Sequence, residues 1–486
     1  MRPPPSARTA RSSPLLTGTA KPYRARTADL LLLCAPLLAL LGAPATAQQP
    51  TPALAAPTAP AAATAWPAYM PGLSPALSES AVAAQLPPDV VITPPNAALP
   101  AGKARFSGVW QGSACMARAC DIRIAVESVT ATGATVVYAG ANEQQPQVTD
   151  RTEASFVGRE LHARLRTGAR LVMRLREGLG ESGEMEIAAW RPETQLLLAG
   201  VLSNRPIAPH YTRSVQRLPT PWVSDDGRAQ TLEAVVYRPL DARGPLPTVV
   251  FNHGSTGAGN RPAWFTFTWT SPEVAQYFTS KGWQVVFPQR RGRGKSDGLY
   301  DEGFGATRSA GYSCQPDRSL PGLDRAITDL DVVMSHLQQR PDVDKTRLLI
   351  GGVSRGGILS VAYAGTRPGM FLGVVNFVGG WLGEACREAG AAVNRTGFVR
   401  GAAFSRPTLW LYGEHDSYYT LASSRASFEA FRAAGGQGRM VDYAPPQGQD
   451  GHGIHQYPAL WQADLDRYLA QVLPPATPVP FTPRSQ

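Results

Sequence analysis

From about residue 210 onward, short apolar runs alternate with segments whose apolar residues recur at helical spacing. The runs are rich in Val, Leu, Phe and Trp, as expected for buried strands, and the segments between them have one apolar face. Strands that alternate with helices predict an α/β fold, with a mostly parallel sheet covered on both faces, over residues 210–474. The predicted strands are LEAVVYRPL, PTVVFNHG, WQVVFPQ, TRLLIGGV, FLGVVNFVGG, RPTLWLYG and GRMVDYAPP.

Residues 105–206 have a different pattern, in which apolar and polar residues alternate over short runs separated by turn sequences such as TGA, RTG and GLGESG. Such runs predict a small antiparallel β domain, either a sheet or a barrel, which we regard as an accessory domain of unassigned role. The predicted strands are DIRIAVESV, ATVVYAG, EASFVG, LHARLR, ARLVMRLR, EMEIAAW and QLLLAGVL.

The amino terminus resembles neither domain. Six basic residues precede the apolar run LLLLCAPLLALLG, which is followed by Ala45-Thr46-Ala47, the pattern of a signal-peptidase cleavage site. A membrane anchor is the alternative, but the run is about 13 residues long, is interrupted by Pro36, and a bilayer span needs about 20. Cys34 lacks the small preceding residue of a lipid-anchored cysteine. Residues 1–47 are therefore predicted to be a signal peptide of an exported protein, periplasmic or secreted, with no stable membrane anchor after cleavage.

Residues 48–104 are dominated by Ala and Pro and predict a flexible linker, and residues 475–486 predict a disordered tail. Loss of the six bases and one acid of residues 1–47 lowers the formal net charge from +10 to about +5. Since the remaining chain has no long run of Lys or Arg, we do not expect a nucleic-acid partner. The sequence does not indicate an oligomeric state.

Four cysteines remain after the predicted cleavage, and an even number in an exported chain is typical of disulfides. The expected pairs are Cys115–Cys120 and Cys314–Cys386. A metal site is the alternative, but no His lies at ligand spacing near either pair. No metal or cofactor is expected.

The pattern G-x-S-x-G occurs twice, around Ser354 and around Ser296. A nucleophile elbow requires a strand, a sharp turn and a helix. Ser354 lies between the predicted strand TRLLIGGV and the predicted helix GILSVAYAG, whereas glycines interrupt the segment after Ser296. Ser354 is therefore the predicted nucleophile.

A serine nucleophile needs a base, which is oriented by an acid. In the order Ser, acid, His, the histidines of DGHGIHQY follow the last predicted strand, and the flanking glycines favour His452 over the alternative base His455. Asp416, in the loop after RPTLWLYG, is the predicted acid. Its competitors are Glu414 and Asp450.

The oxyanion of a tetrahedral intermediate needs two backbone N–H donors. We expect them from Arg355, directly after the nucleophile, and from Ser255 in the loop HGST after PTVVFN. His253 of that loop is expected to hold its conformation. The Arg355 side chain has two interpretations, recognition of a substrate carboxylate or a structural ion pair.

Residues 230–472 resemble the α/β-hydrolase superfamily, in particular its secreted dienelactone-hydrolase-like and prolyl-oligopeptidase-like branches. RRGRGKSDG is similar to a segment after the fourth core strand in these branches, which implies a structural role for Ser296. The resemblance implies the same roles for Ser354, Asp416 and His452. Dienelactone hydrolases use a Cys nucleophile where this chain has Ser354, so their lactone substrate is not carried over.

Together these features predict an exported serine hydrolase that cleaves a small-molecule carboxylic ester through an acyl-enzyme. A serine peptidase of the prolyl-oligopeptidase type is one alternative. Another is a non-catalytic envelope protein that binds a ligand through the β domain.

Overall fold

A computed structural model describes residues 75–473 apart from 116–117, 144–146, 177–182, 192–195 and 447–448. The predicted signal peptide, most of the Ala/Pro-rich segment and the predicted tail lie outside these residues. Within the described part of the chain, no helix combines the length and the apolar character needed to span a bilayer.

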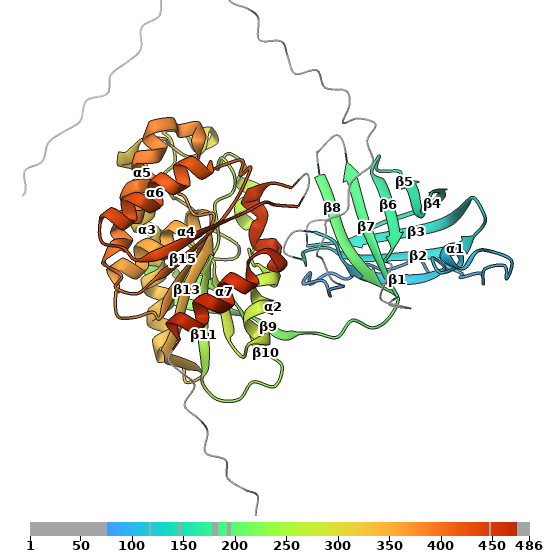
Figure 1. Cartoon of the computed structure of the whole chain (residues 1–486), viewed down its shortest axis with the longest axis horizontal. Helices are drawn as coiled ribbons and strands as arrows, with labels where there is room; N and C mark the ends of the chain where they lie inside the picture. The colour runs from blue at the N-terminus through green and yellow to red at the C-terminus, as the bar shows by residue number, and fades with distance from the viewer. Residues whose placement is uncertain are drawn as a thin grey trace, which may run out of the picture. The chain divides into compact units, whose positions relative to one another are not determined.

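The first folded part is a closed antiparallel barrel in which each strand pairs with the next along the chain and the eighth returns to the first (Figure 1). Closure leaves no unpaired strand edge. The barrel strands are β1 (Gly108–Ser113), β2 (Asp121–Val129), β3 (Gly133–Ala141), β4 (Val148–Val157), β5 (Glu160–Arg164), β6 (Arg170–Leu175), β7 (Glu184–Arg191) and β8 (Leu196–Ser203).

One end of the barrel interior is filled by large side chains. Trp110 of β1 is buried there with Phe106, and its indole N–H donates a hydrogen bond of 2.9 Å to the carbonyl oxygen of Phe106. Leu161 and Met173 belong to the same cluster. This end of the barrel is therefore a packed hydrophobic core.

The second part contains an eight-stranded sheet in the order β16-β15-β14-β13-β11-β12-β10-β9. Its strands are β9 (Tyr211–Val223), β10 (Ala229–Pro239), β11 (Leu246–Asn252), β12 (Gln284–Pro288), β13 (Val343–Val353), β14 (Gly373–Phe377), β15 (Thr408–Gly413) and β16 (Gly438–Tyr443).

The expectation of a mostly parallel sheet applies to only part of this sheet, which is mixed. Neighbours from β11 to β16 are parallel, but β10 is antiparallel to both β12 and β9. The tight turn that joins β9 to β10 requires an antiparallel pair, because a parallel pair needs a longer crossover connection.

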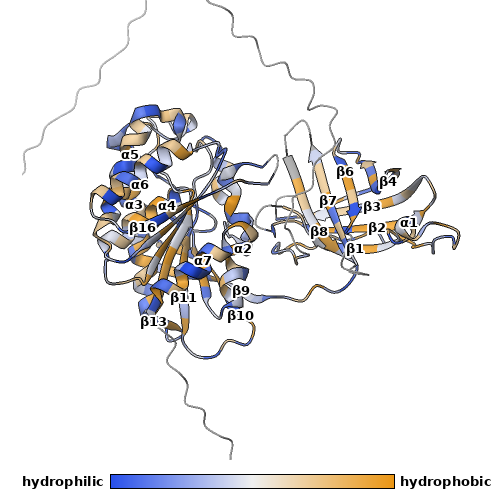
Figure 2. Cartoon of the chain, in the orientation of Figure 1, coloured by the Kyte–Doolittle hydropathy of each residue, from blue (hydrophilic) through white to orange (hydrophobic). Residues whose placement is uncertain are grey.

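Helices cover both faces of the sheet (Figure 1). Helices α3, α4 and α5 contact one another, and α2 and α7 contact each other on the opposite face. The central strands are mainly hydrophobic and the helices are amphipathic (Figure 2), as expected for a sheet buried between two helical layers. The helices are α2 (Pro272–Ser280), α3 (Pro316–Gln339), α4 (Arg355–Thr366), α5 (Arg387–Val399), α6 (Leu421–Ala433) and α7 (Pro458–Val472).

Both expected disulfides are present. Cys115–Cys120 closes the connection between β1 and β2, and Cys314–Cys386 joins the segment before α3 to the segment before α5. The predicted cysteine pairing is confirmed.

Candidate active site

Ser354 lies on the sharp turn between β13, which ends at Val353, and α4, which begins at Arg355. Its backbone has φ +57°, a conformation that L-residues rarely adopt outside strained turns. The turn is held by two backbone bonds, from Ser354 N–H to the Phe377 carbonyl (2.9 Å) and from Gly380 N–H to the Ser354 carbonyl (3.2 Å). The strand, turn and helix are those of a nucleophile elbow.

Packing explains both glycines of G-x-S-x-G. A Cβ on Gly352 would lie 2.5 Å from the backbone of Gly356, and a Cβ on Gly356 would lie 2.0 Å from the carbonyl oxygen of Asn252. The turn can therefore form only if both positions lack a side chain. Gly254, on the loop after β11, also approaches closely, since its Cβ would lie 3.0 Å from that of Ser354.

The structure brings His452 and Asp416 together. The His452 Nδ1 lies 2.9 Å from one carboxylate oxygen of Asp416 and 3.1 Å from the other. Asp416 follows β15, while His452 lies in the short helix η6 (Gly451–Gln456) after β16. Because β15 and β16 are parallel neighbours, both loops leave the sheet at the same edge.

The Asp416 carboxylate is fully buried and also accepts hydrogen bonds from the backbone N–H groups of Tyr418 (2.7 Å) and Tyr419 (3.0 Å). Three donors at a buried carboxylate fix its orientation. Asp416 can therefore hold the His452 ring with Nδ1 protonated.

The competing acid Asp450 has another set of partners. Its side chain accepts hydrogen bonds from the backbone N–H groups of His452 (2.9 Å) and Ser417 (3.0 Å), and so caps η6 and joins the two loops. Burial acts to raise the pKa of Asp450, but the bonds from Ser417 and His452 leave it below its usual value. Glu414 is exposed, and its backbone N–H pairs with the Tyr443 carbonyl.

His455, the alternative base, packs against the ring of Trp269. Its Nδ1 is buried and has no hydrogen-bond partner in the described part of the chain. Burial, with a smaller contribution from His452, lowers the pKa of His455 to about 3. A histidine of this pKa is a weak proton acceptor near neutral pH.

The loop after β11 contains Ser255, the predicted second oxyanion donor, directly after Gly254. His253 is fully buried in this loop. Its Nε2 accepts from the backbone N–H of Arg290 (3.2 Å), so the ring proton is on Nδ1, which donates to the Gly254 carbonyl (2.7 Å). His253 therefore holds the loop, as expected, and burial together with Arg290 and Arg293 keeps its pKa well below the usual value.

Two arginines hold the same loop by its carbonyl groups. Arg290 donates to the carbonyl oxygen of His253 (3.0 Å), and Arg293 donates to that of Gly254 (3.2 Å). Carbonyls fixed in this direction leave the N–H groups of the loop on the other side of the peptide planes.

Arg355 has a structural role for its side chain. The guanidinium is 2% exposed, donates to the carbonyls of Trp381 (2.8 Å) and Glu302 (3.0 Å), and lies over the rings of Tyr312 and Trp381. Burial alone would raise the pKa of Glu302, but Arg290 and Arg355 hold it below its usual value. Of the two interpretations, the structure supports the buried ion pair.

The hydroxyl of Ser296, in the second G-x-S-x-G match, both donates and accepts a hydrogen bond within its own fold region. It donates to the Gln289 carbonyl (2.6 Å) and accepts from the Glu233 N–H (2.8 Å). Gly294 and Gly298 have φ values of +58° and +84°. The motif around Ser296 is therefore a structural loop.

Tyr419 lies beside the candidate His452–Asp416 pair, and the sequence left open whether it lines the pocket or packs in the core. It is buried, its ring lies beside that of His452, and its hydroxyl donates to the Gly380 carbonyl (2.7 Å). Burial raises the pKa of Tyr419, and a hydrogen bond with Ser354 acts in the opposite direction. The doublet Tyr418-Tyr419, which follows Asp416 after Ser417, is the signal in the sequence that indicates this contact.

Among the described residues, no three His, Cys, Asp or Glu side chains are grouped so that they could hold a metal ion. The arrangement can support chemistry that needs a hydroxyl nucleophile, a paired imidazole and backbone N–H donors.

The α/β part is thus similar to the α/β-hydrolase fold in its elbow, in the order of Ser354, Asp416 and His452, and in the loop after β11. A comparison with protein-family models and with curated protein sequences finds no match. Similar solved structures do exist, and they are members of the α/β-hydrolase superfamily.

One is a candidate dienelactone hydrolase from Klebsiella pneumoniae, 19% identical, with a TM-score of 0.35 over 54% of this chain and 98% of that one. Another is Est1E from Butyrivibrio proteoclasticus, 12% identical, with a TM-score of 0.36 over 53% of this chain and 98% of that one. A prolyl endopeptidase is 16% identical, with a TM-score of 0.37 over 72% of this chain and 59% of that one. At these identities and scores, the site has to be interpreted from its own geometry.

Proposed function

We propose that this chain is an exported serine hydrolase that cleaves carboxylic esters of small molecules. The observation that carries the proposal is the hydrogen-bonded pair of His452 and Asp416, presented by loops at the sheet edge where the elbow places Ser354. A buried carboxylate that accepts three hydrogen bonds, one of them from an imidazole, is the arrangement that orients the imidazole as the base for a serine nucleophile.

In the proposed reaction, the Ser354 hydroxyl attacks the acyl carbonyl while Nε2 of His452 accepts its proton. Asp416 keeps the ring in the tautomer with Nδ1 protonated and stabilises the imidazolium that forms. The backbone N–H groups of Ser255 and Arg355 bind the oxyanion. His452 then gives the proton to the leaving alcohol as the ester C–O bond breaks. In the second half, His452 accepts a proton from a water molecule that attacks the acyl carbonyl, the bond to Ser354 Oγ breaks, and His452 returns the proton to Oγ as the acid leaves.

Export is part of the proposal. The two disulfides support an oxidising compartment, since disulfides persist outside the cytosol. Processing after Ala47 would release the mature chain into the periplasm or the medium.

The reaction is tested by a panel of p-nitrophenyl esters of increasing acyl length, assayed beside aminoacyl and prolyl p-nitroanilides. We expect measurable kcat/KM on at least one ester, a much lower value on every anilide, and no turnover above background by Ser354→Ala. Preference for an anilide would favour the peptidase alternative. A folded wild-type protein that hydrolyses neither series would contradict the proposal.

A further inference from the structure

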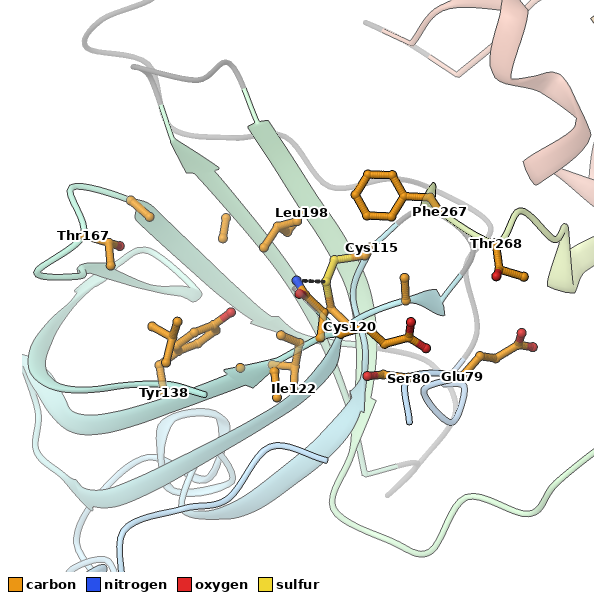
Figure 3. A pocket seen from close by; sticks show the side chains of 18 of the residues that line it. Glu79, Ser80, Cys115, Cys120, Ile122, Tyr138, Thr167, Leu198, Phe267 and Thr268 are labelled. Atoms are coloured by element: carbon orange, nitrogen blue, oxygen red, sulfur yellow. Dashed lines mark hydrogen bonds between the residues drawn. A yellow bond between two sulfur atoms is a disulfide. The ribbon is translucent and has the colours of Figure 1, made fainter. Parts of the chain in front are cut away.

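The barrel is packed at one end and hollow at the other. A cavity of about 320 Å³ lies within the half where the connections β1–β2, β3–β4, β5–β6 and β7–β8 meet. Its wall includes residues next to all four connections, among them Cys115, Asn142, Leu165 and Leu198. Figure 3 shows Ile122, Tyr138 and Leu198 around this space, with the Cys115–Cys120 disulfide beside them.

The hollow follows from the size of the inward-facing residues. At the closed end these are Trp110, Met173 and other large side chains, whereas the cavity wall has Gly140, Ala169 and Ala189 at inward positions. A closed barrel of eight strands has an interior that side chains can just fill. Small residues confined to one half therefore leave room there for another molecule.

The position of Tyr138 also depends on a glycine. A Cβ on Gly140 would lie 2.7 Å from the Tyr138 hydroxyl oxygen and 3.1 Å from its ring, so the phenol can lie along the wall only because residue 140 is glycine. The phenol thus borders the cavity, whose inner wall is otherwise mainly hydrocarbon, from Ile122, Leu165 and Leu198.

We propose that this cavity is a binding site for one neutral, mostly hydrocarbon molecule with a single uncharged polar group such as a hydroxyl or carbonyl. The volume is near the lower end of the roughly 300–1,000 Å³ of small-molecule sites. It is about twice that of an engineered apolar cavity of about 150 Å³ that binds benzene. A two-ring compound or a chain of about ten carbons is of the appropriate size.

The polarity of the wall selects a neutral ligand. The uncharged polar groups of the wall are the Tyr138 hydroxyl, the Asn142 amide and the Thr167 hydroxyl. Its charged residues, Glu79, Glu143 and Arg213, lie outside the barrel strands, and Arg213 is 3.4 Å from Glu79. Asp150 is opposite Tyr138 in the register of β3 and β4, but Arg166 pairs with it at 2.9 Å. Because Arg213, the cation in this wall, is already paired with Glu79, an ionised headgroup would lose its hydration without gaining a free opposite charge, which is costly in an apolar site.

The test is titration of the full mature chain with the neutral fluorophore N-phenyl-1-naphthylamine, followed by displacement with 1-decanol or with decanoate. The protein is labelled beforehand with a fluorophosphonate, and Ser354→Ala is titrated in parallel, so that the candidate active site is excluded as the source of the signal. We expect saturable binding of one fluorophore per chain in both preparations, and displacement by decanol at about tenfold lower concentration than by decanoate.

Two variants fill the cavity, Ala189→Phe and, as a milder change, Ala169→Leu. Each is expected to weaken fluorophore binding about tenfold or more without affecting ester hydrolysis. The matched control is Ala131→Phe, in the exposed β2–β3 turn at the other end of the barrel. Circular dichroism and thermal unfolding identify any variant that fails to fold.

The proposal is overturned if wild type shows no saturable binding, or if folded Ala189→Phe and Ala169→Leu both bind the fluorophore as wild type does. It is independent of the proposed hydrolase. Loss of ester hydrolysis with intact binding would contradict the reaction only, and loss of binding with intact hydrolysis would contradict the cavity site only.

Discussion

The carboxylates of Asp416 and Asp450 belong to the two loops that present His452, but they bind different atoms of it. Asp416 contacts the ring at Nδ1, whereas Asp450 accepts from the backbone N–H. An amide in place of Asp416 would present an N–H to the ring or hold the wrong tautomer, while an amide in place of Asp450 can still accept from the backbone through its oxygen.

We therefore expect Asp416→Asn to lower kcat/KM for an ester by about 10⁴-fold, the loss typical of a triad with the wrong tautomer. Asp450→Asn, the matched control in the neighbouring loop, should retain most of the activity. The measurement is steady-state kinetics of both variants on one p-nitrophenyl ester. A larger loss in Asp450→Asn would assign the acid to Asp450.

His455 predicts a pH dependence of stability. Its pKa is about 3 in the folded chain and about 6.5 when unfolded, so between these values the unfolded state binds one more proton. Stability should therefore fall as the pH falls below 6.5, by up to about 1.4 kcal/mol per pH unit from this residue.

His455→Gln removes this titration, and we expect the slope of unfolding free energy against pH, between pH 6 and 4, to decrease by about 1.4 kcal/mol per pH unit. Urea unfolding at several pH values measures it. The comparison uses slopes, so a uniform destabilisation by the substitution does not affect it. Exposed His210→Gln is the control, and equal slopes in wild type and His455→Gln would show that His455 is not buried in its neutral form.

For single residues, an expected role in the site could be derived from the sequence where the order of strands and loops along the chain constrains it. Ser354 and the His452–Asp416 pair follow from the order of strands and loops. The side chain of Arg355 could not be assigned, because its partner Glu302 and the rings of Tyr312 and Trp381 come from other segments and meet it only after folding. For the same reason, the sequence could not decide whether Tyr419 lines the pocket or packs in the core.

Among the secondary-structure elements, two strands were not predicted. β1 has glycine at Gly108 and Gly112, which weakens its apolar pattern, and its pairing with β2 and β8 is decided by barrel closure. β9 lies at the edge of the sheet, is largely exposed, and contains Pro219 and Pro221. Proline and polar residues are tolerated at an edge, where one side of the strand has no partner.

The two disulfides close loops of very different length, with sequence separations of 72 for Cys314–Cys386 and 5 for Cys115–Cys120. Loop-closure entropy predicts a loss of about 4 kcal/mol of unfolding free energy for the double variant Cys314→Ser/Cys386→Ser, and about 2 kcal/mol for Cys115→Ser/Cys120→Ser. Denaturant unfolding of both variants measures the two losses. A greater loss for the shorter loop would show that the entropy of the unfolded chain does not determine their contributions.

For the whole molecule, the change from alternating to continuous apolar runs near residue 210 separates a barrel from an α/β part, and the sequence showed this change. The alternating runs left a sheet and a barrel as alternatives, so neither barrel closure nor the cavity could be decided from the sequence. Both depend on which residues of distant strands share a level inside the barrel, and strand periodicity alone does not specify this.

The export proposal predicts the size of the mature protein. Expressed with its leader in a bacterial host, the chain should be recovered outside the cytoplasm with Gln48 at its amino terminus, because cleavage follows Ala45-Thr46-Ala47. Amino-terminal sequencing and intact mass of the recovered protein measure this. A cytoplasmic product that retains residues 1–47 would contradict export.

The central claim is that Ser354 is an activated nucleophile, and fluorophosphonate labelling tests it most directly. After reaction of the purified chain, intact mass and peptide mapping should show a single adduct, on the peptide that contains Ser354, with loss of ester hydrolysis in proportion to labelling. Ser354→Ala should remain unlabelled, and Ser296→Ala should be labelled as wild type is. Absence of an adduct on folded wild type, or equal labelling of Ser354→Ala, would contradict the account.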